Sequence, residues 1–138
     1  MPEQKKPLPA VMALSYLGDA VYSLYVRRRL VETGISHAGD LNRLSLSFVT
    51  APRQAERAKA LLPLLTEEEA DVYRRAYNHK GLGHPAHATN AEYRAATGLE
   101  AVLGALSLRG EEARLSFLLD TIHQNAFYVT KEKEEIKS

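Results

Sequence analysis

Apolar residues recur along most of the chain at the three- and four-residue spacing that is typical of amphipathic helices. This pattern predicts an all-α fold with helices over about 9–32, 38–48, 50–62, 66–79, 90–108 and 111–126. In the first helix, Leu14, Leu17, Val21 and Leu24 form one apolar stripe, and Val11, Tyr22 and Val26 fall on another face. Further apolar residues on its other faces indicate a central helix, or one that is shared with a second subunit.

Residues that can cap a helix mark the start of three of these segments. Thr66 and Glu69 have the spacing of a capping box. Thr50 precedes Pro52, which suits the first turn of a helix, and Asn90 is expected to cap the fifth helix. Two glycines and one proline within residues 80–89 predict the longest loop.

The composition sets limits on the class of protein. A chain of 138 residues fits one domain, which we expect over 9–128 between an N-terminal tail (1–8) and a charged C-terminal tail (129–138). The chain has no cysteine, which excludes disulfides and thiolate zinc sites. No signal peptide or membrane span is evident, so a cytoplasmic location is expected. A net charge of +1 means that nucleic-acid binding requires a local basic patch.

Two isolated acidic residues are the candidate chemistry. Asp19 is the only charged residue between Lys6 and Arg27, and Glu100 is the only one between Ala95 and Leu108. A carboxylate in an apolar helix is costly unless something pairs with it. Each acid has Gly and Ala nearby, which allow helices to approach closely, so the two carboxylates could meet and share a magnesium ion. The alternative is that each acid pairs with an arginine, such as Arg28 or Arg94.

Basic and polar residues gather at three places and form the candidate RNA-binding set. Their alternative is an ordinary solvated helix surface. The set consists of Arg53 and Arg57 on the third helix, Arg74, Arg75, Asn78, His79 and Lys80 at the end of the fourth, and Asn90, Tyr93 and Arg94 at the start of the fifth. The His84-x-x-His87 spacing invites a zinc site, but no third ligand is evident, and RNA contact or plain exposure is favoured.

The two acidic segments carry a resemblance to a known family. Leu17-Gly18-Asp19-Ala20-Val21 resembles the core motif of the ribonuclease III family, and Glu100-Ala101-Val102-Leu103-Gly104 resembles its second acidic helix. With their flanking residues, Tyr16 to Arg27 and Asn90 to Ala101, they resemble the Mini-III ribonucleases. These are short bacterial relatives that lack the double-stranded RNA-binding domain. The similarity covers about residues 10–126.

This resemblance implies an all-helical homodimer that hydrolyses double-stranded RNA with magnesium and leaves 5′-phosphate and 3′-hydroxyl ends. Asp19 and Glu100 are then the catalytic, metal-binding residues. For the Mini-III group it implies maturation of large-subunit (23S) ribosomal RNA precursors, and it leaves open whether a ribosomal protein presents the substrate. The full-length enzymes have further acids where this chain has Met12, Ser15 and Thr97, so two acids per subunit remain.

Two other functions stay open at this point. A non-catalytic RNA- or protein-binding scaffold of the same fold fits the missing acids, and Mg²⁺-dependent cleavage separates it from the nuclease. A helical interaction module in which Asp19 and Glu100 are salt-bridged predicts that the two acids lie far apart or each contact an arginine.

Overall fold

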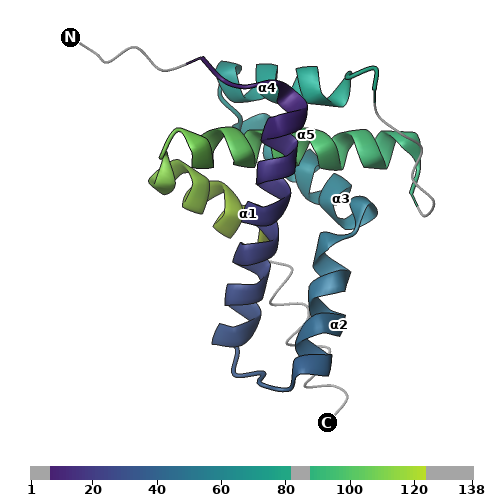
Figure 1. Ribbon diagram of the computed structural model, residues 1–138, viewed down its shortest axis with the longest axis vertical. Helices are drawn as coiled ribbons and strands as arrows, with labels where there is room; N and C mark the ends of the chain where they lie inside the picture. Colours follow the sequence, from purple (N-terminus) through teal and green to yellow (C-terminus); the bar gives the residue numbers. More distant parts are fainter. Residues whose placement is uncertain (1–6, 82–87, 124–138) are drawn as a thin grey trace.

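The computed structural model describes residues 7–81 and 88–123, and every regular element in these ranges is helical. The elements are α1 (Val11–Glu32), α2 (Ala38–Val49), α3 (Ala51–Leu61), the 3₁₀ helix η1 (Leu62–Leu64), α4 (Glu67–Tyr77) and α5 (Asn90–Leu108), and a further helix occupies residues 112–123. The all-α class is confirmed. Helix α1 crosses α5 at the centre, and the other helices lie around this pair (Figure 1).

The crossing of α1 and α5 is a contact between backbones. A Cβ atom at Gly18 of α1 would overlap the carbonyl oxygen of Glu100, and one at Gly104 of α5 would overlap the carbonyl oxygen of Leu14. Only glycine fits at either position, so the two helices approach more closely than side chains usually permit. The residues next to Gly18 and Gly104 are therefore held at a fixed separation.

The buried face of α1 draws on both of the apolar faces that the sequence shows. The residues at four-residue spacing that face the core are Leu14, Gly18, Tyr22, Val26 and Leu30. The stripe that begins at Leu14 shares only its first residue with this face, and its last, Leu24, is 58% exposed. Tyr22 and Val26 belong to the second apolar face, and the glycine contact with α5 determines that this face turns toward the core.

The helix ends agree with the sequence at one site and differ at others. Thr66 and Glu69 form the predicted capping box at the start of α4. At the start of α5 the cap is Thr89, which forms a second capping box with Glu92, so the prediction of Asn90 was wrong by one residue. Thr50 occupies the N-cap position of α3, but its side chain makes no capping hydrogen bond.

Substituting the contact glycines tests this arrangement. Gly18→Ala and Gly104→Ala are each expected to destabilise the protein by at least about 3 kcal/mol, because a methyl group meets backbone atoms that cannot move independently. Gly39→Ala in α2 is the matched control, since its Cβ would meet only the side chain of His37. It should be neutral or stabilise by about 0.5–1 kcal/mol. Chemical denaturation measures all three, and equal stability of the three variants contradicts the account.

Candidate active site

The carboxyl groups of Asp19 and Glu100 lie beside each other at the crossing of α1 and α5. Asp19 directly follows Gly18, and Glu100 is the residue whose backbone Gly18 touches. The two side chains are within hydrogen-bonding reach of each other. Asp19 is exposed, whereas Glu100 is half-buried. One acid of the pair therefore faces solvent and the other is anchored in the protein.

Proximity and burial change the proton affinity of this pair. Burial, followed by the charge of Asp19 and the hydrogen bond to it, raises the pKa of Glu100 to about 8. At neutral pH and without a cation, Glu100 is therefore mostly protonated and shares its proton with Asp19. A cation placed between the two carboxylates would replace that proton.

In the described part of the chain, no basic side chain neutralises the pair. Within 7–81 and 88–123, neither Asp19 nor Glu100 forms an ion pair with a lysine, arginine or histidine. The interaction module with salt-bridged acids is thus not supported. No group of three or more His, Cys, Asp or Glu that could hold a metal occurs among the described residues, so these two carboxylates are all the acidic ligands that the crossing offers.

Two of the three positions where the resemblance implies further acids in full-length relatives are buried here. Ser15 is 7% exposed and Thr97 is 4% exposed. The Thr97 hydroxyl donates to the carbonyl oxygen of Tyr93 at 2.8 Å, one turn earlier in α5. Both side chains are small and buried, so they support the packing of α1 and α5 next to the two acids.

Most of the candidate RNA-binding residues stay predictions. The end of α4 and the start of α5 come together, because Arg94 donates to the carbonyl oxygens of Tyr77 at 2.7 Å and His79 at 3.3 Å. This contact brings Asn78, His79, Lys80, Asn90 and Tyr93 to one end of the molecule. Asp71 pairs with both Arg74 and Arg75, and Glu56 pairs with Arg53. His84 and His87 lie outside the described residues.

For two of the arginines the structure favours a role inside the protein. Arg94 caps the carbonyl groups at the end of α4, as described above. Arg57 donates to the hydroxyl of Tyr22 and to the carbonyl oxygen of Phe48. A guanidinium that is held by such contacts is oriented by the protein and is less available to a phosphate.

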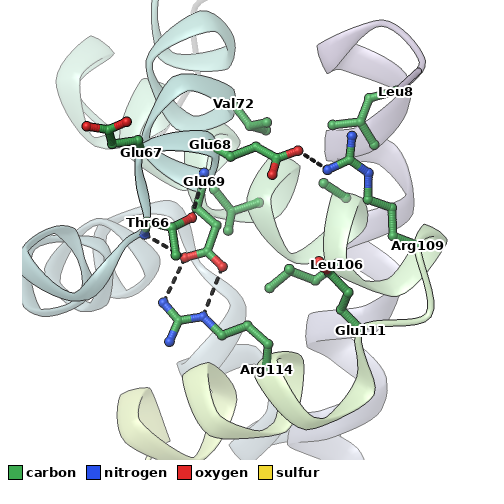
Figure 2. A pocket seen from close by; sticks show the side chains of 12 residues that line it. Leu8, Thr66, Glu67, Glu68, Glu69, Val72, Leu106, Arg109, Glu111 and Arg114 are labelled. Atoms are coloured by element: carbon green, nitrogen blue, oxygen red, sulfur yellow. Dashed lines mark hydrogen bonds and ion pairs between the residues drawn. The ribbon is translucent and has the colours of Figure 1, made fainter. Parts of the chain in front are cut away.

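A cavity of about 600 Å³ lies away from the two acids, between α4, α5 and the helix at 112–123 (Figure 2). Its α5 residues Val102, Ala105 and Leu106 are on the opposite side of that helix from Glu100, by the 100° turn per residue. Arg109 pairs with Glu68 at its rim. In contrast to the acidic pair at the crossing, this cavity combines an apolar floor with paired charges.

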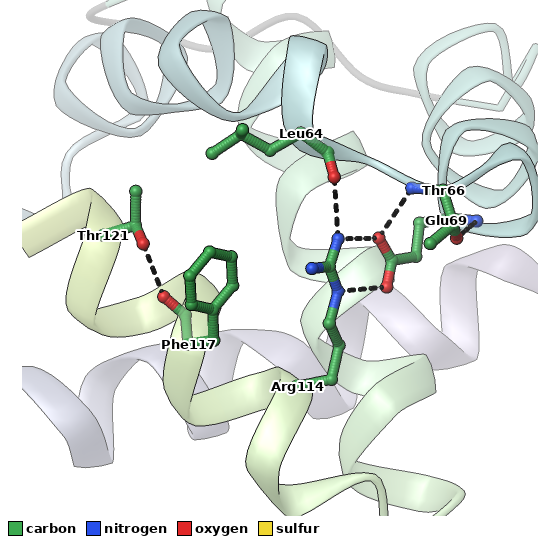
Figure 3. Close-up of polar contacts among 6 residues, drawn as sticks. All are labelled: Leu64, Thr66, Glu69, Arg114, Phe117 and Thr121. Carbon is green, nitrogen blue, oxygen red and sulfur yellow. Dashed lines mark hydrogen bonds and ion pairs between the residues drawn. The ribbon is translucent and has the colours of Figure 1, made fainter.

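The second ion pair at this cavity joins two helices. The guanidinium of Arg114 donates to both carboxylate oxygens of Glu69, at 2.8 and 2.9 Å, and to the carbonyl oxygen of Leu64 at 2.7 Å (Figure 3). These bonds lower the pKa of Glu69, against the effect of its burial. This ion pair thus holds the helix at 112–123 against the start of α4, so Glu69 and Arg114 have a structural role.

Residues 12–111 match the model of the ribonuclease III domain, so the chain belongs to the ribonuclease III family. It is an endoribonuclease of that type. The family acts on double-stranded RNA and generally depends on divalent metal ions. No helix in the described part of the chain is long and apolar enough to cross a membrane.

Within that family the chain is similar to proteins called Mini-ribonuclease 3. The protein from Symbiobacterium thermophilum is 49% identical over 78% of this chain and 83% of its own length. The one from Thermoanaerobacter sp. is 41% identical over 79% of this chain and 77% of its own length. A crystal structure of a Fusobacterium nucleatum protein matches with a TM-score of 0.77 and 29% identity, over 85% of this chain and 93% of that one. The predicted resemblance and fold are confirmed.

The raised pKa of Glu100 predicts a pH-dependent stability in the absence of divalent cations. The folded protein holds the Glu100 proton up to about pH 8, whereas an unfolded glutamate loses it near its ordinary value of 4.5. The stability should therefore fall as the pH rises through this range. Burial lowers the pKa of His123 to about 3, and this lowers the stability of the protein chiefly below about pH 6.5. Between pH 6.5 and 8, the change in stability therefore reports mainly on Glu100.

In this window the wild-type protein in EDTA is expected to lose about 2 kcal/mol of unfolding free energy, and Glu100→Gln should lose much less, because a neutral amide cannot ionise. Urea denaturation at pH 6.5, 7.2 and 8 measures both. Parallel curves for the two proteins would show that the carboxyl of Glu100 is not perturbed by its surroundings.

Proposed function

We propose that this protein is a magnesium-dependent endoribonuclease that cleaves double-stranded RNA with Asp19 and Glu100. The observation that carries the proposal is the placement of two carboxyl groups side by side, without a basic partner among the described residues, at a crossing where glycines bring two helix backbones into contact. Each acid lies in a motif that resembles the family's acidic segments, and the family match supports the reaction class.

The donor set fits magnesium better than a softer metal. The crossing offers carboxylate oxygens only, and Mg²⁺ binds through one or two carboxylates while keeping several waters or phosphate oxygens. Bound there, it would supply charge neutralisation at the scissile phosphate and an activated water. Glu100 anchors the site from the buried side, and the exposed Asp19 faces the substrate. Hydrolysis is proposed to leave 5′-phosphate and 3′-hydroxyl ends.

The RNA is proposed to lie across the end of the molecule where α4 and α5 meet. Charged and polar groups at that end suit contacts with phosphates and 2′-hydroxyls, which is how A-form helices are recognised. The proposed contacts are Asn78, His79, Lys80, Asn90 and Tyr93, with Arg53, Arg74 and Arg75 on neighbouring surfaces.

The protein is proposed to work as a homodimer. The exposed side of α1 carries large apolar side chains: Tyr16 is 86% exposed, and Leu24 and Val31 are also exposed. Large exposed aromatic and aliphatic side chains along one helix are typical of a subunit interface. Because Tyr16 is only three residues before Asp19, the interface would place the two active sites of the dimer near each other.

The biological substrate is proposed to be the precursor of large-subunit (23S) ribosomal RNA in the cytoplasm, with a ribosomal protein as a further partner. This part rests on the similarity to the Mini-ribonuclease 3 proteins. The alternative is a non-catalytic scaffold of the same fold, which the small side chains at Ser15 and Thr97 keep open.

Removing either carboxylate should abolish cleavage. Asp19→Asn and Glu100→Gln keep the shape of each side chain but remove the negative charge that holds the cation, so cleavage of a long duplex RNA with Mg²⁺ is expected to fall at least about 100-fold. Asp40→Asn on the surface of α2 is the matched control and should cleave normally. Circular dichroism checks folding. Full activity of the two variants, or of the wild type in EDTA, contradicts the assignment.

The dimer is tested through the exposed side of α1. Tyr16→Glu is expected to weaken self-association at least about tenfold, because a charge would be buried in an apolar interface. Leu108→Glu, at an exposed apolar position on α5, is the matched control and should associate like the wild type. Sedimentation equilibrium measures both. A Tyr16 variant that dimerises as tightly as the wild type places the interface elsewhere.

A further inference from the structure

Arg57 of α3 closes a triangle of hydrogen bonds that joins three helices. Its Nη1 donates to the hydroxyl of Tyr22 on α1 at 3.2 Å and to the carbonyl oxygen of Phe48 in the last turn of α2 at 3.0 Å. The Tyr22 hydroxyl donates to the same carbonyl oxygen at 2.9 Å. One guanidinium, one phenol and one carbonyl thus fix α1, α2 and α3 relative to each other.

The polar groups in this triangle would lack hydrogen-bond partners without one another. The carbonyl of Phe48 is among the last four of α2, which lack the usual intrahelical donor and lie at the negative end of the helix dipole. The guanidinium also lies 5.2 Å from the centre of the Phe48 ring, within the range of cation–π attraction. Tyr22 is fully buried, so losing a partner would leave a polar group unsatisfied inside the protein.

The position of Tyr22 connects this triangle to the acidic pair. Tyr22 follows Asp19 by three residues and lies one turn beyond Gly18 on the same buried face of α1. The contact at Gly18 itself involves no side chain, so the rotation of α1 about its own axis is set by the buried side chains on either side of it. Tyr22 is the next residue along that face, and its hydroxyl is held by two other helices. Together with the buried side chains of Leu14 and Val26, it therefore sets the angle at which α1 presents Asp19.

A small rotation of α1 is enough to matter. The carboxylate of a helical aspartate lies about 6 Å from the helix axis, so a turn of 10° moves it by about 1 Å. A displacement of about 1 Å in a catalytic group can cost about 100-fold in rate.

Tyr22 is also close enough to Glu100 for the charge of that carboxylate to affect its pKa. Burial raises its pKa to about 12, Arg57 opposes that shift, and the charge of Glu100 adds to it.

We propose that Arg57 is a positioning residue for the cleavage reaction, which acts through Tyr22 to orient Asp19 toward Glu100, and that it is not a contact to the RNA. The inference rests on the proposed nuclease function. It replaces the phosphate contact predicted from the sequence, which treated Arg57 as equivalent to Arg53 one turn earlier. The two differ in the structure, because Arg53 is exposed and pairs with Glu56 on its own helix.

Arg57→Lys distinguishes a positioning role from an RNA contact, because lysine keeps the positive charge but lacks the planar guanidinium group. The single-turnover cleavage rate at saturating protein should fall about 10- to 100-fold. The affinity for the same duplex RNA in EDTA, measured by fluorescence anisotropy, should change less than about threefold, since phosphate contacts respond chiefly to charge. Arg43→Lys on α2, which exchanges another surface arginine, is the matched control and should change neither quantity.

The route through Tyr22 is tested by a double-mutant cycle. Tyr22→Phe removes the hydroxyl but keeps the ring, and it should also slow single-turnover cleavage without weakening RNA binding. If Arg57 acts through Tyr22, combining Arg57→Lys with Tyr22→Phe should be no slower than the slower single variant. Thermal unfolding is followed for each protein, and rates are compared where all remain folded. If the Arg57 variant does not fold, Tyr22→Phe alone carries the test through its rate and affinity.

Three outcomes overturn the inference. Weaker RNA binding with an unchanged saturating rate would make Arg57 an RNA contact. Multiplying effects in the double variant would show that the two residues act independently, and an unchanged rate in both single variants would leave no positioning role. A wild-type protein that fails to cleave duplex RNA with Mg²⁺ removes the proposed function and this inference with it, whereas an active wild type with unaffected variants removes the inference alone.

Discussion

The contact between the backbones of α1 and α5 is the constraint on which the rest of the structure depends. Gly18 touches the backbone of Glu100 and Gly104 touches the backbone of Leu14, with no side chain between the helices at these two points. Two helices in backbone contact cannot slide or separate without leaving a gap in the core, so the residues beside the contact are held in place. Asp19 is one of these residues, and the pair of carboxyl groups is a direct consequence of how closely the helices approach.

The same contact explains the electrostatics of the pair. Bringing Glu100 into the interior beside another acid raises its pKa to about 8, and no basic side chain in the described structure offsets this cost. Buried ionisable groups without compensation are uncommon in structural positions and frequent at functional ones. The contrast with Glu69, whose carboxylate is fully paired with Arg114, shows that this chain does neutralise its acids where their role is structural.

The sequence was informative where the decisive residues are neighbours along the chain. Helical spacing identified the all-α class, and two acids isolated in apolar segments identified the candidate site. The correct cap of α5 could also have been found, because Thr89 has the three-residue spacing to Glu92 that a capping box requires. The buried face of α1 could not, because it depends on where Gly18 meets another helix. Nor could the partners of Arg57, since Tyr22 lies 35 residues away.

The central claim is that the crossing holds two carboxyl groups so that one cation replaces one proton. Calorimetric titration of Mg²⁺ into the metal-free protein at pH 7, in two buffers with different ionisation enthalpies, measures the protons released on binding. The account predicts about one proton released per site, because a group with a pKa near 8 is about nine-tenths protonated at that pH, and no release from Glu100→Gln. Mg²⁺ binding without proton release, or equal release from that variant, would contradict it.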